Sequence, residues 1–348
     1  MTMEVQTKET SDSSAAAASH SQSLQNAISV LHRLRAAIKD QVIGRDNIIE
    51  LVIIALMADG HVLLEDHPGS GKTTLAKALG EAISNPEIPG NQYIQAFRRI
   101  QFTPDLLPSD VTGGSVFDTQ SNSFHFRPGP IFAHVVLADE INRTSPKVQS
   151  AMLEAMGEKQ VTVDNTTYAL DDLFFVIATQ NPLDLAGTYP LPTPQLDRFL
   201  FKITMSHIER DAELDVLNTY KERRSTAGKA SSLVSRDEVL DARRIIDEKV
   251  NIADSIKTAL VDISRSIRAD ERVLQGNSTR SMVLLLPALQ VHAALNERDY
   301  VNCDDLETLL PRVLEHRVEL APGVSDFNRV LGDCMKEPME QLARSLLR

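Results

Sequence analysis

The sequence predicts an α/β domain, with a parallel sheet covered on both faces, followed by an all-helical domain. Between residues 42 and 207, short apolar runs alternate with segments of helical periodicity, which is typical of parallel strands joined by helices. After residue 207 the strand pattern ends and helical segments follow. The length of 348 residues agrees with this division, since it allows about two domains.

Five apolar runs are the expected strands of a central five-stranded sheet. Each run is short, largely apolar and bounded by polar or turn-forming residues. They comprise residues 62–65, 99–102, 135–138, 174–178 and 199–203. Because they alternate with helices, we expect the strands to be parallel and buried on both faces.

The remaining segments define the domain organisation. Residues 1–23 are rich in Ser, Ala, Thr and Glu and are expected to form a disordered tail. Residues 24–207 form the expected α/β domain and residues 208–348 the helical domain. Residues 115–126 and 160–170 alternate β-forming residues around a turn, which predicts two inserted β-hairpins that are either surface decoration or contact loops.

The composition argues against several function classes. A formal net charge of −12 disfavours a large nucleic-acid interface, because phosphate binding needs a surplus of Lys and Arg. The apolar stretch at residues 51–58 is too short to cross a bilayer, and the N-terminus has no signal-peptide pattern. Cys303 and Cys334 lack a metal-ligand spacing and are expected to be reduced. We therefore expect a cytoplasmic protein that does not insert into membranes.

The run DHPGSGKTT, residues 66–74, is the expected phosphate-binding loop of an ATP site. It follows an apolar strand and opens a helix, which is the context that such a loop requires. Gly69 and Gly71 allow the backbone N–H groups to face the phosphates. Lys72 would bridge the β- and γ-phosphates, and the hydroxyl of Thr73 would bind Mg²⁺. Asp66 departs from the usual pattern, which has Gly at the first position.

Two further strands end in polar residues of the kind that ATP hydrolysis needs. The run VVLADE places Asp139 and Glu140 at the end of a buried strand, where α/β sheets place their chemistry. Asp139 would hold Mg²⁺, and Glu140 would polarise the attacking water. Asn181 ends the next strand and would orient that water, although Asn before Pro is also common in ordinary turns.

Two arginines are candidates for stabilising the transition state, in which negative charge spreads over the γ-phosphoryl oxygens. They are Arg198, in QLDRF, and Arg280, in STRS. From the residues alone, each fits a surface or salt-bridged arginine better than a catalytic one.

Together these motifs resemble the AAA+ ATPases, and within them the MoxR family. The resemblance extends from about residue 23 to the C-terminus and rests on motifs that occur in the family order. These motifs are VIGR (42–45), LLEDHPGSGKT (63–73), RRIQFTPDLLPSDVTGG (98–114), FRPGPIFAHVVLADEINRTSPKVQSAMLEAM (126–156), ATQNP (178–182), GTYPLPTPQLDRF (187–199), GNSTRS (276–281) and PRVLEHR (311–317). Asp66 is common among MoxR relatives, whereas Thr279 replaces a frequent Pro.

The resemblance implies a P-loop αβα sandwich with a helical lid, and a ring, expected to be a hexamer, with ATP and Mg²⁺ between subunits. Glu140, Asn181 and Arg280 would act within one subunit, and Arg198 would reach in from the neighbour. Thr73 and Asp139 would bind the nucleotide Mg²⁺. The expected nucleotide-binding residues are Ile43, Gly44, His67, Pro68, Gly69, Ser70, Gly71, Lys72, Thr73 and Thr74. The two hairpins would be inserts that face the pore or a client.

The resemblance also implies partners. MoxR-type proteins are thought to act as chaperones that remodel or mature client complexes, including by metal-cofactor insertion. They often work with a protein carrying a von Willebrand factor A domain, which here would be a separate chain.

Three alternatives remain open at the level of sequence. A nucleic-acid motor would share the architecture, but the acidic charge counts against it. A scaffold that holds ATP without turnover would not need the Asp139–Glu140 pair. A magnesium-chelatase-like ATPase subunit would fit residues 187–199 and 311–317 less well.

Overall fold

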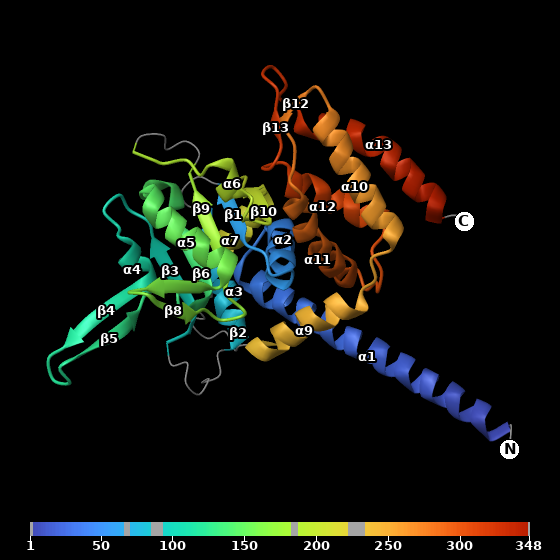
Figure 1. Cartoon of the computed structure of the whole chain (residues 1–348), viewed down its shortest axis with the longest axis horizontal. Helices are drawn as coiled ribbons and strands as arrows, with labels where there is room; N and C mark the ends of the chain where they lie inside the picture. Colours follow the sequence, from blue (N-terminus) through green and yellow to red (C-terminus); the bar gives the residue numbers. More distant parts are fainter. Residues whose placement is uncertain (1–2, 66–69, 85–92, 182–186, 222–233, 347–348) are drawn as a thin grey trace.

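A computed structural model describes residues 3–65, 70–84, 93–181, 187–221 and 234–346 of the chain. At its centre lies a five-stranded sheet with the strand order β10-β1-β9-β6-β3 (Figure 1). The strands are β1 (Val62–Glu65), β3 (Gln95–Gln101), β6 (Ala133–Asp139), β9 (Phe175–Gln180) and β10 (Phe201–Thr204). Every pairing between them is parallel. The predicted sheet is therefore confirmed.

Helices cover both faces of this sheet. Leu64 of β1 lies in the core cluster that contains α1–α3, whereas its neighbour Leu63 lies in the cluster that contains α5, because successive side chains of a strand point to opposite faces. The helices of this part are α2 (Asp46–Met57), α3 (Lys72–Ala82), α4 (Pro108–Thr112), η1 (Ile141–Arg143), α5 (Pro146–Glu158), α6 (Thr193–Leu196) and α7 (Arg210–Asn218).

The C-terminal part is helical, as predicted. It contains α9 (Arg236–Lys249), α10 (Asp254–Ala269), α11 (Thr279–Leu295), α12 (Cys303–Leu314) and α13 (Phe327–Leu346). Their apolar faces join the core cluster of α1–α3. This part also contains short strands that the sequence did not reveal, because two or three residues are too few to show a period. They are β12 (Val273–Gln275), which pairs with β13 (Glu319–Leu320), and β11 (Val234–Ser235), which pairs with β2 (Ile83–Ser84).

The N-terminal segment differs from the expectation. One helix, α1, runs from Met3 to Gln41 and projects from the body of the molecule (Figure 1), whereas a disordered tail was expected for residues 1–23. The chain contains neither Gly nor Pro before Gly44, so the two strongest helix breakers are absent from this segment. From Leu24 onward the apolar side chains at helical spacing, including Leu31, Leu34 and Ile38, are buried. Among the described residues, no helix combines the length and the apolar composition needed to cross a membrane.

Two antiparallel hairpins lie at the predicted insert positions and contact each other. Strand β4 (Gly113–Asp118) pairs with β5 (Ser123–Pro128), and β7 (Gln160–Val163) with β8 (Thr166–Ala169). Phe126 stacks on Tyr168 with ring centroids 3.8 Å apart, and the Ser115 hydroxyl donates to the Asp164 carboxylate at 2.6 Å. Beyond this contact the β4/β5 hairpin extends away from the body (Figure 1) and carries the exposed pair Phe117 and Phe124.

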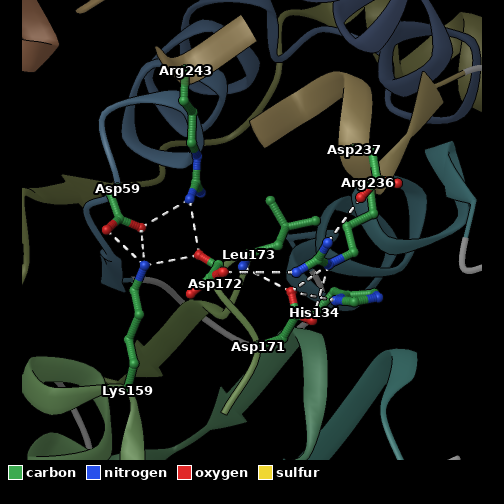
Figure 2. Close-up of polar contacts among 9 residues, drawn as sticks. All are labelled: Asp59, His134, Lys159, Asp171, Asp172, Leu173, Arg236, Asp237 and Arg243. Atoms are coloured by element: carbon green, nitrogen blue, oxygen red, sulfur yellow. Dashed lines mark hydrogen bonds and ion pairs between the residues drawn. The ribbon is translucent and has the colours of Figure 1, made fainter. Parts of the chain in front are cut away.

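A buried acid–base cluster joins α9 to the edge of the sheet where the strands begin (Figure 2). Arg236, in the first turn of α9, donates from Nε to both oxygens of Asp171 at 2.9 and 3.0 Å. Asp171 precedes β9, and His134 Nδ1 at the start of β6 lies 3.3 Å from its Oδ1. Burial alone would raise the pKa of Asp171, but hydrogen bonds from His134 and Arg236 hold that pKa well below its usual range.

The base of the β7/β8 hairpin is tied to the same helix (Figure 2). Lys159, just before β7, donates to both oxygens of Asp59 at 2.7 Å. Arg243 of α9 donates to Asp59 Oδ1 at 2.9 Å and to the backbone oxygen of Asp172 at 3.1 Å. Helix α9 is therefore fixed to both ends of the hairpin by charged contacts.

We expect Asp171→Asn to lower the free energy of unfolding by about 3 kcal/mol at neutral pH, because it removes one partner of a buried ion pair. The pKa of Asp171 is depressed in the folded state. The stability it contributes is therefore present above the unfolded pKa of about 4 and is lost as the pH falls below it. Urea unfolding at several pH values measures both effects.

Asp172→Asn is the matched control, because this neighbouring side chain is 81% exposed. It should change the unfolding free energy by less than about 0.5 kcal/mol. If the difference in unfolding free energy between wild type and Asp171→Asn does not shrink as the pH falls, the depressed pKa of Asp171 is contradicted.

Candidate functional site

The described part of the phosphate-loop region leads directly into helix α3. Gly71 caps this helix with a left-handed backbone, φ +94°, which glycine adopts at little cost. Lys72 and Thr73 form the first turn of α3, where backbone N–H groups attract anions. The predicted site residues His67, Pro68 and Gly69, together with Asp66, lie outside the described residues.

Beside this helix terminus lies a cavity of about 510 Å³, a size typical of small-ligand sites. Three segments line it: residues 41–45 after α1, residues 70–74 at the start of α3, and residues 207–217 around α7. The predicted residues Ile43, Ser70, Gly71 and Thr74 are among its lining residues. The cavity thus lies between the VIGR motif, residues 42–45, and the end of the expected phosphate-binding loop.

The lining segments are held together closely. A Cβ atom added to Gly44, whose φ is +69°, would lie 2.6 Å from Cβ of Ala212 on α7. A side chain at position 44 would therefore displace α7 from the cavity. Arg45 is buried and donates to the backbone oxygens of Ser70 and Ser206, so it connects all three segments.

Asp139 and Glu140 lie at the carboxyl end of the buried strand β6. Glu140 has a left-handed backbone conformation, φ +58°, which is uncommon for a residue other than glycine and is frequently found at functional sites. The Thr179 hydroxyl donates to Asp139 Oδ1 at 2.7 Å and accepts from the Glu140 N–H at 2.8 Å. This buried threonine on β9 therefore fixes both residues. Thr179 was not among the predicted site residues, although a polar residue in an apolar run was a signal for it.

Strand β3 contributes two more contacts to these carboxylates. Gln101 lies opposite Asp139 in the sheet register, and its amide donates to Glu140 Oε2 at 2.9 Å. Arg99, two residues earlier, donates twice to Asp139 Oδ2. Arg143 Nε lies 3.3 Å from Glu140 Oε2. Arg99 and Gln101 were not predicted as site residues, because only the strand register places them beside Asp139 and Glu140. Arg143 lies three residues after Glu140 in the chain.

Asn181 directly follows β9. In the sheet, β9 lies between β1 and β6, and parallel strands end at one common edge. The structure therefore brings Asn181 to the same edge as the phosphate-loop region after β1 and the carboxylates at the end of β6.

Neither predicted arginine lines the cavity of its own chain. Arg198 donates from Nη1 to the backbone oxygen of Leu153 on α5 at 2.6 Å, and the same atom would lie 2.4 Å from a Cβ atom at Gly157. Arg280 is exposed in the first turn of α11. The N-terminus of α11 is attached near Arg198, because the Ser281 hydroxyl donates to Asp197 at 3.2 Å.

The motif at residues 311–317 fixes the helical part to this segment. Arg317 is 4% exposed; it donates to Asp197 Oδ1 at 2.7 Å and to the backbone oxygen of Phe199 at 2.6 Å. His316 Nε2 lies 3.0 Å from the same Phe199 oxygen. Burial, with the nearby Arg317 charge, lowers the pKa of His316 to about 3, so its imidazole is neutral at physiological pH.

The donor chemistry at the site suits a hard cation. The hydroxyl of Thr73 and the carboxylate of Asp139 are oxygen ligands, which Mg²⁺ prefers, together with water and phosphate. Within the described ranges, no group of three or more His, Cys, Asp or Glu side chains is placed to hold a metal ion.

Comparison with known proteins gives a consistent assignment. Residues 61–201 match the ATPase family associated with various cellular activities (AAA), and residues 265–329 match the AAA lid domain. The chain is 47% identical over 281 residues to YeaC of Bacillus subtilis, covering 81% of this chain and 84% of YeaC. It is 32% identical over 326 residues to Chaperone MoxR1 of Mycobacterium tuberculosis, covering 87% of this chain and 81% of MoxR1.

A solved structure supports the same fold. A crystal structure from Cytophaga hutchinsonii matches the chain with a TM-score of 0.79 at 33% sequence identity, covering 93% of this chain and 97% of that chain.

Proposed function

The chain belongs to the MoxR family of AAA+ ATPases, and from this premise we propose that it hydrolyses ATP with Mg²⁺ to remodel or mature a protein client in the cytoplasm. Chaperone-like ATPase membership follows from the similarity to Chaperone MoxR1 and to the AAA family. The individual steps, the assembly and the partners are parts of the proposal.

In this proposal the cavity between residues 41–45 and α7 takes the adenine. The phosphate loop, including residues 66–69, and Lys72 bind the phosphates. Thr73 and Asp139 hold Mg²⁺, which neutralises charge on the β- and γ-phosphates when bound. Glu140 accepts a proton from the attacking water, and Asn181 orients that water.

One observation carries the proposal. The start of α3, Asn181 and the Asp139–Glu140 pair lie after or at the ends of β1, β9 and β6 respectively, which are neighbours in the sheet. A cavity of about 510 Å³ adjoins the same helix terminus. This arrangement combines a binding pocket, a cation at Lys72 and two carboxylates at one edge, as ATP hydrolysis requires.

We further propose that the ATPase forms a ring, expected to be a hexamer, in which Arg198 acts on the neighbour's ATP. Support comes from the position of Arg198 away from its own chain's cavity. Arg280 would act within its own subunit, brought to the nucleotide by the lid. Closed rings arise from head-to-tail contacts of this kind.

The client would contact the hairpins. The exposed Phe117 and Phe124 on the projecting β4/β5 hairpin favour this role, because exposed apolar pairs are typical of interaction sites. A separate protein with a von Willebrand factor A domain is the expected partner, and metal-cofactor insertion is one candidate task. Co-purification of such a partner tests this part.

Lys72→Ala should weaken ATP binding roughly tenfold to a hundredfold, because charge-assisted bonds to phosphate are lost. Equilibrium titration with a fluorescent ATP analogue measures the change. Lys77→Ala is the matched control on the same helix, since Lys77 is 50% exposed and pairs with Glu81. Equal affinities for the two variants would contradict the proposed phosphate site.

A further inference from the structure

Arg99 is bound to a carboxylate that the proposed function assigns to the metal. Its Nε and Nη2 atoms lie 3.0 and 2.6 Å from Asp139 Oδ2. The other carboxylate oxygen accepts from Thr179 at 2.7 Å. Both oxygens of Asp139 are therefore engaged by side chains of this chain, and its negative charge is neutralised by the guanidinium.

The two partners differ in how freely they can move. The Asp139 side chain is 11% exposed and anchored by Thr179, whereas the Arg99 side chain is 47% exposed. The Arg99 side chain can therefore move from Asp139 into solvent, because its guanidinium is not buried. Thr179 holds the carboxylate in place after such a departure.

We propose that Arg99 is a positioning residue that competes with Mg²⁺ for Asp139 and is displaced when the magnesium nucleotide binds. Two cations cannot share one carboxylate oxygen closely without mutual repulsion. The inference rests on the proposed nucleotide site and goes beyond it by assigning a competitor for the metal.

Displacement of Arg99 would also change the hydrogen-bond contacts of Glu140. Arg99 Nη2 donates to Gln101 Oε1 at 2.6 Å, and the Gln101 amide donates to Glu140 Oε2 at 2.9 Å. When Arg99 leaves Asp139, Gln101 loses its partner on one side. Occupation of the metal position is thereby linked through two side chains of β3 to the carboxylate that acts on water.

The test is the Mg²⁺ dependence of nucleotide binding. A fluorescent ATP analogue is titrated against Arg99→Gln and wild type at increasing Mg²⁺, and once in EDTA. We expect Arg99→Gln to reach half-saturation at a Mg²⁺ concentration roughly threefold to tenfold lower, the effect of removing an ion pair worth about 1 kcal/mol. Binding in EDTA should stay unchanged.

Arg98→Gln is the matched control, because Arg98 is exposed on the adjacent position of the same strand. It should leave the Mg²⁺ dependence as in wild type. Arg99→Lys keeps the charge without the double hydrogen bond. Its Mg²⁺ concentration at half-saturation should lie between those of wild type and Arg99→Gln. This second variant keeps the proposal testable if Arg99→Gln fails to fold.

Three outcomes overturn the inference or its premise, and they differ from one another. An unchanged Mg²⁺ half-saturation in Arg99→Gln overturns the competition. Weaker binding of that variant in both Mg²⁺ and EDTA means that Arg99 contacts phosphate instead. Absence of nucleotide binding by wild type refutes the proposed function itself.

Discussion

Replacing Glu140 with glutamine should lower the rate of ATP hydrolysis by about 10²–10⁴-fold while ATP still binds, because the amide cannot accept a proton from the attacking water. The backbone at residue 140 is left-handed, φ +58°, and its N–H is held by Thr179, so glutamine keeps the local geometry. Phosphate release measures the hydrolysis rate, and titration with a fluorescent nucleotide measures ATP binding.

The matched control for this variant is Glu154→Gln, an exposed glutamate on α5. It should hydrolyse ATP at the wild-type rate. Equal rates for Glu140→Gln and wild type would favour the alternative in which the chain holds ATP without turnover.

The same variant offers access to the client. Glu140→Gln should stay in the ATP-bound state, in which we expect the client to remain attached. A pull-down under ATP should recover a protein. Recovery of nucleic acid without a protein would favour the nucleic-acid motor instead.

Replacing Arg198 with alanine should lower hydrolysis by about 10³-fold or more, because the variant lacks the arginine that we propose stabilises charge on the transferred phosphoryl group. ATP binding should change little, since Arg198 does not line the cavity of its own chain. Arg198→Lys should be impaired as well, because lysine lacks the planar pair of donors.

Arg198 also donates to the Leu153 backbone, so thermal unfolding must accompany the rate measurement. Arg210→Ala, which removes an arginine that is 83% exposed, is the control. A folded Arg198→Ala protein with the wild-type rate would refute the proposed role.

The architecture was largely predictable because it depends on periodicities that the sequence carries. The central strands β1, β6, β9 and β10 overlap runs of largely apolar residues, and each hairpin alternates around a turn. The edge strand β3 is more polar and mostly exposed, and it begins at Gln95, four residues before the predicted start. The short strands β11 and β12 escaped prediction, since so few residues carry no period. The helical start of α1 escaped it because its polar composition indicated disorder, although the segment contains no Gly or Pro, the strongest helix breakers.

The candidate site was predictable only in part. Lys72, Asp139 and Glu140 stand in motifs with a fixed spacing, so the sequence identifies them. Arg99, Gln101 and Thr179 depend on which strands are neighbours and in what register, and their contacts span 39 or 40 residues of chain. The Arg236–Asp171 pair joins residues 65 positions apart, a distance over which local patterns say nothing.

The central claim is that one ATP site is built from two subunits. The most direct test mixes two variants that are each impaired in hydrolysis. Lys72→Ala subunits keep Arg198, and Arg198→Ala subunits keep the phosphate site. Phosphate release by an equal mixture should recover to about a quarter of the wild-type rate, because random head-to-tail neighbours complete about one site in four. If the subunits exchange and the mixture remains as inactive as each variant alone, the shared site is contradicted.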